Sequence, residues 1–330
     1  MTLFQRIIDM FSRELEAHGR AFLNYEALAQ VEVKDMTIDG FPAKLFFNPA
    51  RVRSVMADVS PEALQKRACF LCPDGLEPLQ LTTVWDSPTG QTYFIRVNPF
   101  PIFNHHFTIS SAIHERQTFA PHMESMLHLA EAMPEMSIFY NGPMCGASAP
   151  DHMHFQAVPR HSMPIEDYFS TNYANAVLVQ ESDLQSHLAT LEKVLSMASI
   201  PENASQTGSL TAGASHTEEW EPRWNIISWY EPESSASVVS DLQGKARSTG
   251  AADLQPTGRS YNTIVFFRKE SRPQCFFAPE NERILFSPGT VEMGGVGIVA
   301  NRDSFDRITP EVLRSMIQEV ADTLPITNIQ

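Results

Sequence analysis

The stretch YNGPMCGASAPDHMHFQAVPR, residues 140–160, indicates the fold and the chemistry of this chain more clearly than any other. Its pattern predicts the end of one strand, a loop of small residues, and a second strand that carries His152, His154 and Gln156. Because side chains alternate along a strand, these three residues share one face. The other face is apolar and suits a hydrophobic core, with Met153, Phe155 and Ala157.

The loop before this second strand is built from small residues, namely Gly142, Gly146, Ala147 and Ser148. Small residues let backbone N–H groups approach an anion closely. A histidine beside such an anion is a competent nucleophile toward phosphorus, because its ordinary pKa of about 6.5 leaves it neutral near pH 7. An isolated His-x-His pair is more often an ordinary pair of strand residues. The loop and the glutamine that follows favour a phosphate site here.

A second feature is the Cys69-Phe70-Leu71-Cys72 segment, whose spacing lets two thiolates bind one tetrahedral metal ion. Two further ligands must come from elsewhere, and several histidines are available: His105, His106, His114, His152 and His154. A redox dithiol and a chance pairing are the alternatives. The other two cysteines, Cys145 and Cys275, have no partner at ligand spacing, and we expect them to fill space in the core.

The rest of the chain alternates short β-type runs with few helical patterns, which favours an α+β protein built on antiparallel sheet. A helical pattern begins the chain, another covers residues 121–133, and a last helix starts with Thr309 as N-cap and Pro310 in its first turn. Strands are predicted at 43–49, 81–86, 91–98, 104–111, 137–141, 152–158, 224–230, 261–267, 274–279 and 294–301.

The chain has 330 residues, 39 acidic against 24 basic side chains, and a formal net charge of −15. This acidic balance argues against a nucleic-acid-binding protein. The sequence contains no run of 18 or more apolar residues, so it predicts no membrane-spanning helix. The N-terminus lacks the features of a signal peptide. Four cysteines form no disulfide framework, so we expect a reducing, cytoplasmic setting without a membrane partner.

These motifs together resemble the transferase and phosphorylase branch of the histidine-triad (HIT) superfamily. That branch includes galactose-1-phosphate uridylyltransferase, diadenosine tetraphosphate phosphorylase and GDP-L-galactose (GDP-hexose) phosphorylase. The resemblance covers residues 40–165 with specific motifs and residues 220–325 only loosely. It implies HIT-like antiparallel sheets flanked by helices, with two HIT-like halves in one chain.

The resemblance also implies roles for individual residues. His154 would be the nucleophile, and Gln156 would donate its amide to a phosphate oxygen. A structural zinc ion would be held by Cys69, Cys72, His114 and His152. Substrate phosphates would meet Asn141, Gly146, Ala147 and Ser148, with Arg51 and Asn98 on the nucleotide side.

Two departures from the uridylyltransferase pattern stand out. The segment Pro150-Asp151-His152 has one residue more than that pattern, and Ala112 replaces the proline of its Ser-Pro-x-His motif. The match of His-Met-His-Phe-Gln-Ala, residues 152–157, is closer to the GDP-hexose phosphorylases. A metal-free site with a structural His152 is the alternative, because the GDP-hexose branch need not keep the metal.

The activity implied is nucleotidyl transfer from a nucleoside-diphosphate sugar, with GDP-hexose favoured, through a covalent nucleotidyl-histidine. Sugar 1-phosphate would leave, and phosphate or another sugar 1-phosphate would accept the nucleotide. The alternatives are a dinucleoside polyphosphate phosphorylase or hydrolase, a zinc-stabilised nucleotide-binding protein without turnover, and a redox protein based on Cys69 and Cys72. The resemblance also allows a homodimer.

The domain division predicted from the sequence has four parts. Residues 1–20 form an N-terminal helix, and 21–200 the catalytic HIT-like half with the metal site. Residues 201–260 form a loop-rich insertion around a short strand, because 201–218 and 231–259 are rich in Ser, Thr, Gly and Ala. Residues 261–330 form the C-terminal HIT-like half.

Overall fold

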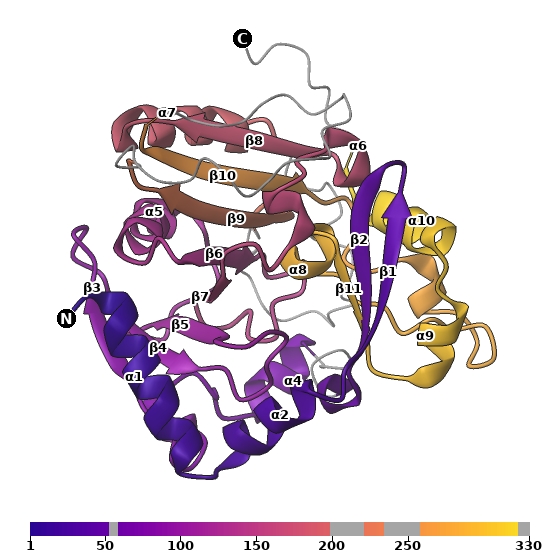
Figure 1. Cartoon of the computed structure of the whole chain (residues 1–330), viewed down its shortest axis with the longest axis horizontal. Helices are drawn as coiled ribbons and strands as arrows, with labels where there is room; N and C mark the ends of the chain where they lie inside the picture. Colours follow the sequence, from indigo (N-terminus) through magenta and orange to yellow (C-terminus); the bar gives the residue numbers. More distant parts are fainter. Residues whose placement is uncertain (53–58, 199–220, 234–257, 323–330) are drawn as a thin grey trace, which may run out of the picture.

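An eight-stranded antiparallel sheet forms the centre of the protein in a computed structural model that describes residues 1–52, 59–198, 221–233 and 258–322 (Figure 1). Its strand order is β3-β4-β5-β7-β6-β9-β10-β8. The strands are β3 (Thr83–Asp86), β4 (Thr92–Val97), β5 (Phe107–Ser111), β6 (Met136–Asn141), β7 (His154–Pro159), β8 (Ala176–Glu181), β9 (Trp224–Glu231) and β10 (Ser260–Phe267).

A three-stranded sheet lies beside the large one, at the right of Figure 1. In it β2 (Phe41–Phe47) pairs antiparallel with β1 (Glu32–Ile38) and parallel with β11 (Val296–Val299). Residues separated by about 250 positions in the sequence therefore form one sheet, and the C-terminal part of the chain is tied to its beginning.

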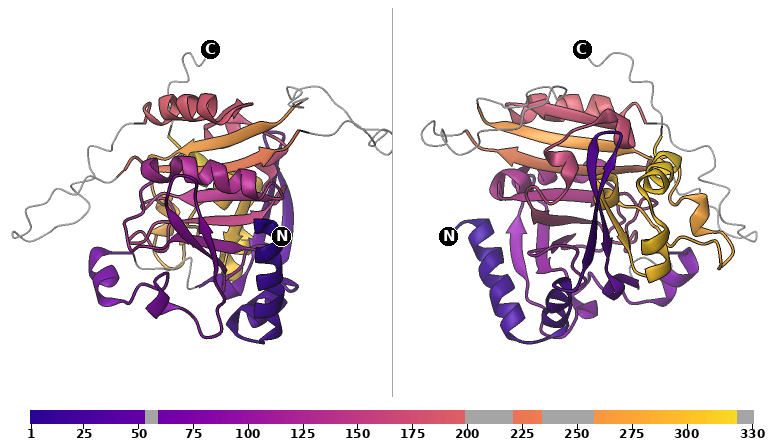
Figure 2. Two further views of the ribbon diagram at one scale, coloured as in Figure 1. Left: turned by 90° about the vertical axis from the view of Figure 1, so that its left-hand side faces the viewer. Right: turned by 45° about the vertical axis from the view of Figure 1, so that its right-hand side comes forward.

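Helices cover both layers (Figure 2). The first helix, α1, packs on β3 and β4, α5 packs on β6 and β9, and α7 packs on β8 and β10. The helices are α1 (Leu3–Glu16), α2 (Arg20–Leu28), α4 (Pro61–Lys66), α5 (Met123–Ala132), α6 (Thr171–Ala174), α7 (Leu184–Leu195), α8 (Thr290–Met293), α9 (Arg302–Arg307) and α10 (Pro310–Val320).

Two hydrophobic cores lie on opposite faces of the large sheet, and strand alternation explains the division. On β6, Ile138 and Tyr140 belong to the core under α1, α5 and α7, whereas Phe139 between them belongs to the second core. On β7, Phe155 faces the first core and Val158 the second. All six residues of β6 are buried because both faces of the sheet are covered.

The structure confirms the α+β class with antiparallel sheets flanked by helices. It also confirms the last helix, in which Thr309 accepts a hydrogen bond from the Val312 amide and Pro310 begins the helix. The strand predicted at 274–279 is wrong: Gln274–Phe276 form a 3-10 turn that Pro273 begins. A proline cannot donate to a sheet ladder, which favours the turn.

The domain division stays a prediction. Most of 201–218 and 231–259 lies outside the described residues. The strand predicted inside that insertion is β9, which pairs with β6 on one side and β10 on the other. Strand β8, which the division put in the first half, pairs with β10. Among the described residues, no helix is both long and apolar enough to cross a membrane.

Candidate active site

Strand β7 positions the predicted catalytic pair. It lies between β5 and β6, with His154 opposite Ser110 and Gln156 opposite Thr108 on β5. The side chains of His154 and Gln156 line a cavity of about 430 Å³ on the face of the sheet that carries the second core. His152 lies in the loop two residues before the first residue of the strand, and its side chain belongs to a separate cluster of cysteines and histidines.

The ring of His154 is held in one orientation. Its Nδ1 lies 2.8 Å from the His152 carbonyl oxygen, so Nδ1 carries the proton and donates it there. The Gln117 amide pairs with the backbone N–H and C=O of His154 at 2.8 and 3.0 Å, which fixes the backbone at this position. The other ring nitrogen, Nε2, has no hydrogen-bond partner among the described residues. A neutral imidazole with Nε2 unprotonated is the form that can attack phosphorus.

Burial keeps His154 neutral. Desolvation lowers its pKa to about 4, although the bond to the His152 carbonyl opposes the shift. The side chain therefore holds an available lone pair at neutral pH.

Gln156 is oriented by His106, which the sequence offered only as an available metal ligand and which lies outside the cysteine–histidine cluster. The Ile102 amide donates to Nδ1 of His106 at 3.2 Å, so the proton of the neutral His106 ring is on Nε2. That Nε2 lies 2.8 Å from Oε1 of Gln156 and donates to it. Burial lowers the pKa of His106 to about 3, so the ring stays neutral. The NH₂ group of Gln156 is therefore left as a donor on a side chain that lines the cavity.

Asn98 supports the same arrangement. Its Nδ2 lies 3.5 Å from Oε1 of Gln156, and its Oδ1 accepts the Phe100 amide at 2.9 Å. Asn98 lines the cavity beside Gln156. His105, another candidate ligand from the sequence, packs its ring on Phe11 instead, with ring centroids 4.5 Å apart.

The cavity lining is basic in a chain whose net charge is −15. Four arginines line it, Arg20, Arg51, Arg67 and Arg96, against the two carboxylates Glu77 and Glu292. Burial lowers the pKa of Arg51 to about 10, which still leaves it charged at neutral pH. Arg96 is buried, Arg51 and Arg67 are partly buried, and Arg20 is exposed and pairs with Glu77. Arginines beside a nucleophilic histidine are suited to phosphate oxygens.

The small-residue loop reaches the cavity as expected. Gly146, with φ of +97°, and Ser148 line it, whereas Ala147 is buried and is not among the lining residues that the structure describes. A Cβ at Gly146 would stand 2.7 Å from the Cα of Gly289, so both the φ angle and the close approach require glycine. The loop thus packs against the segment 287–292 from the C-terminal part of the chain.

Asn141 joins the same two segments. Its Oδ1 accepts from the Thr290 amide and hydroxyl, each at 2.8 Å, and from Asn225 Nδ2 at 3.0 Å. Asn141 and Thr290 both line the cavity. Residues from both ends of the chain therefore form the walls of the site.

Cys69, Cys72, His114 and His152 form one cluster, with their ligand atoms all within 4.8 Å of one another. Nδ1 of His152 lies 3.2 Å from Sγ of Cys69, and Nδ1 of His114 lies 3.3 Å from Sγ of Cys72. A tetrahedral ion with bonds of about 2.0–2.3 Å to nitrogen and sulfur needs ligand atoms at such separations.

The chemistry of these donors fits a metal ion. Nε2 of His152 lies 2.9 Å from the Ser111 carbonyl and donates to it, which leaves the lone pair of Nδ1 directed at the thiols. Burial disfavours the Cys69 thiolate, but hydrogen bonds from the protonated His152 ring and from backbone amides outweigh it and lower the pKa of Cys69 to about 6. Binding of an ion would displace the proton from Nδ1 and use its lone pair. The chain therefore holds a Cys₂His₂ group that could bind a metal.

The structure thus brings eleven of the twelve predicted residues to two places, all except Ala147. The cluster holds the four predicted metal ligands, and the cavity is lined by the other seven: Arg51, Asn98, Asn141, Gly146, Ser148, His154 and Gln156. Sequence reasoning missed His106, Arg67, Arg96 and Gln117 as parts of the site. Only His106 carried a sequence signal, as a histidine left over after the metal ligands had been assigned.

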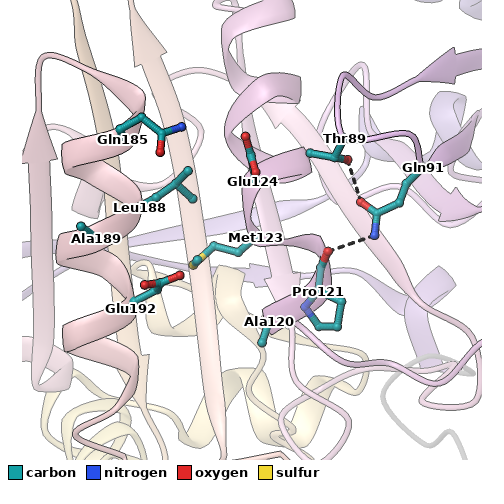
Figure 3. Close-up of a pocket in the computed structure, with 10 residues that line it drawn as sticks. All are labelled: Thr89, Gln91, Ala120, Pro121, Met123, Glu124, Gln185, Leu188, Ala189 and Glu192. Atoms are coloured by element: carbon teal, nitrogen blue, oxygen red, sulfur yellow. Dashed lines mark hydrogen bonds between the residues drawn. The ribbon is translucent and has the colours of Figure 1, made fainter.

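A second cavity, of about 460 Å³, lies between the N-terminal end of α5 and α7 (Figure 3). Its lining contains Glu124 and Glu192 but no histidine, cysteine or arginine among the described residues. Its lining thus offers neither an imidazole or thiol nucleophile nor a cation for phosphate, and the cavity at His154 is the candidate active site.

Comparisons with known proteins agree with this fold. A family model described as a domain of unknown function (DUF4922) matches residues 10–159. No curated protein sequence matches the chain. The structure of yeast Ap4A phosphorylase Apa2 is similar, with a TM-score of 0.54, 12% identity, and coverage of 97% of this chain and 98% of that chain.

Two further structures of the same yeast enzyme are also similar. The complex with Ap4A has a TM-score of 0.53 and 13% identity, and covers 94% of this chain and 96% of that chain. The complex with AMP has a TM-score of 0.51 and 12% identity, and covers 95% and 99%. At these identities the likeness shows a shared fold along nearly the whole of both chains.

Proposed function

We propose that this protein is a nucleotidyltransferase that cleaves a phosphoanhydride through a covalent nucleotidyl-His154 intermediate. One observation carries the proposal: His154 is neutral, its Nδ1 is held by the His152 carbonyl, and its free Nε2 belongs to a side chain lining an arginine-rich cavity.

The reaction has two displacements at the same phosphorus. Nε2 of His154 attacks the α-phosphorus of the nucleotide, an N–P bond forms, and the bridging P–O bond breaks with its electron pair going to the departing phosphate. An incoming phosphate oxygen then attacks the α-phosphorus and the N–P bond breaks, which restores the neutral histidine. Dividing one displacement into two uses the same nucleophile twice.

Gln156 stabilises charge on the α-phosphate in both steps. Because His106 occupies Oε1 of the amide, the NH₂ group is available to donate to a non-bridging oxygen. An amide cannot transfer a proton to a leaving group. This suits a leaving group that departs as a phosphate anion, since such a group needs no general acid.

The metal we propose at Cys69, Cys72, His114 and His152 is a structural zinc ion. Four protein ligands leave no position for substrate, so zinc would supply stability rather than Lewis-acid chemistry. His152 connects the two regions, because its side chain belongs to the cluster and its carbonyl holds the ring of His154.

The substrate has two candidates. The His-Met-His-Phe-Gln-Ala segment favours a nucleoside-diphosphate hexose, with GDP-hexose first, whose cleavage releases sugar 1-phosphate. The fold shared with yeast Ap4A phosphorylase favours a dinucleoside polyphosphate as the second candidate. Both would present an α-phosphorus to His154 and transfer a nucleoside monophosphate.

A substrate panel tests the proposal. The protein is incubated with GDP-hexoses, UDP-hexoses or diadenosine tetraphosphate in separate reactions, each with and without inorganic phosphate. The products are separated by anion-exchange chromatography. We expect a nucleoside diphosphate from one of these classes and none from the His154→Ala variant. Product release that requires no phosphate acceptor would indicate a hydrolase, and no turnover on any substrate would overturn the proposal.

A further inference from the structure

Arg67 follows α4 and has a fixed side chain at the cavity. Its Nη2 donates to Oδ1 of Asp151 at 2.5 Å, and its guanidinium lies 4.8 Å from the centre of the Phe70 ring. The side chain is 24% exposed and lines the same cavity as His154. The ion pair with Asp151 fixes one edge of the guanidinium, and the Phe70 ring restricts the orientation of its plane. The Arg67 side chain therefore keeps little rotational freedom.

The other edge of the guanidinium lacks an acceptor. Nη1 of Arg67 is buried and has no hydrogen-bond partner among the residues that the structure describes. Arg96, in the same cavity, differs: its donors bond to the Leu71 carbonyl at 2.8 Å, Thr82 Oγ1 at 3.0 Å and Ser110 Oγ at 3.2 Å. Buried polar groups are normally paired, so an unpaired charged donor at a cavity indicates a partner that a ligand supplies.

Asp151 ties this arginine to the catalytic strand. It is the extra residue between Pro150 and His152, and it lies three positions before His154. Its contact with Arg67 spans 84 positions of the sequence. Because Asp151 neutralises only one edge of the guanidinium, the free edge remains a donor for a second anion.

We propose that Arg67, held by Asp151, binds in turn the phosphate group that leaves the α-phosphorus opposite His154 and the phosphate that attacks this phosphorus in the second step. This inference rests on the proposed function and specifies it. The ligand is a phosphate dianion, either a phosphate monoester that departs in the first step or inorganic phosphate that enters in the second. One subsite serves both because the two groups occupy the same side of the α-phosphorus in turn.

The test measures phosphate binding and turnover separately. Titration calorimetry of inorganic phosphate into the full-length protein uses the wild type, Arg67→Gln and Asp151→Asn. Arg314→Gln is the matched control, since Arg314 also pairs with one carboxylate, Asp39, at 2.6 Å, but on the surface. Steady-state kinetics on the active substrate of the panel then give KM for phosphate, and single-turnover quench experiments without phosphate give the rate of the first step.

We expect Arg67→Gln to weaken phosphate binding about thirtyfold and Asp151→Asn about fivefold, with Arg314→Gln within twofold of the wild type. Departure of the phosphate in the first step should slow in the same order. A rise in KM for phosphate alone would assign the subsite to the acceptor only, and equal phosphate affinity in Arg67→Gln and the wild type would overturn the inference.

Two other outcomes, a folding defect in the variant and a failure of the proposed function, can be distinguished from a failure of the inference about Arg67. Arg67→Lys keeps the charge but not the two-edged donor geometry, and we expect it to restore less than half of the lost affinity. Phosphate binding by the wild type without turnover on any substrate would contradict the proposed function and leave the Arg67 site standing.

Discussion

His152 and His154 are two residues apart, and each serves a different region of the molecule. In His152 the proton is on Nε2, which donates to Ser111, and Nδ1 faces two thiols. In His154 the proton is on Nδ1, which donates to the His152 carbonyl, and Nε2 has no partner in the part of the chain that the structure describes. Burial is outweighed by hydrogen bonds to the Cys69 sulfur and the Ser111 carbonyl, which raise the pKa of His152, whereas burial lowers the pKa of His154. The backbone acceptor thus decides which nitrogen each ring offers.

The comparison shows that two histidines at the start of one strand can serve different purposes, one as a metal ligand and the other as a nucleophile. A ring with Nδ1 available is a metal ligand toward the cysteine cluster, and a ring with Nε2 available is a nucleophile toward the cavity. Exchange of these roles would require the ring protons to move to the opposite nitrogens.

The largest effect should come from removing the nucleophile. We expect His154→Ala to lower kcat by about a thousandfold or more while the melting temperature stays within a few degrees, because no metal ligand is lost. His152→Ala should lower both. Steady-state rates and differential scanning calorimetry measure the two quantities. Equal loss of melting temperature in both variants would break the distinction between the two histidines.

Removal of the metal should act through stability. One zinc per chain is expected by elemental analysis, and Cys69→Ser should lower the melting temperature by about 10 °C or more, with activity lost in proportion to unfolding. Cys275→Ser is the matched control, since Cys275 is half-buried and lies outside the cluster. Full stability and activity after verified metal removal would show that the cluster does not need an ion.

Removal of the Gln156 amide should have an intermediate effect on kcat. We expect Gln156→Ala to lower kcat about a hundredfold, because a donor to the charged phosphate oxygens is lost. KM for the nucleotide should change little, and the zinc content should stay at one per chain. If KM rises while kcat is unchanged, Gln156 acts in binding alone.

The smallest effect on kcat should come from replacing His106, which holds the Gln156 amide. We expect His106→Asn to lower kcat about tenfold, because the amide of Gln156 is then free to turn its oxygen into the cavity. His187→Asn is the control: His187 is also buried, its Nε2 lies 2.8 Å from Thr263 Oγ1, and burial lowers its pKa to about 4. In the double variant with Gln156→Ala, the His106 change should add nothing further. An additive loss would mean that His106 acts independently of Gln156.

Much of the site could be predicted because the informative residues are close in sequence. The alternation of His154 and Gln156 and the Cys69/Cys72 spacing are local patterns, and the cavity and the cluster hold these residues. The α+β class follows from the short β-type runs along the chain, and the resemblance to the HIT superfamily, rather than spacing, selects His114 and His152 as the other two ligands. Strand β7 begins only at His154, so His152 belongs to the preceding loop, which the alternation alone does not show.

The rest depends on contacts that no local pattern encodes. The bond from His106 to Gln156 needs β5 and β7 to be neighbours, and the Arg67–Asp151 pair spans 84 positions. Gly289 meets Gly146 only because the C-terminal segment folds back over the cavity. The basic cavity in an acidic chain is likewise a result of tertiary folding. The net charge counts every charged residue of the chain, whereas only a few of these residues line the cavity.

The covalent intermediate is the most direct test of the central claim. The protein is mixed with the active nucleotide in the absence of phosphate, quenched at alkaline pH, digested, and analysed by mass spectrometry. The account predicts one nucleoside monophosphate added to the peptide that contains His154, lost on addition of inorganic phosphate and absent in His154→Ala. A nucleotide adduct on another residue, or turnover with no adduct on His154, would contradict it.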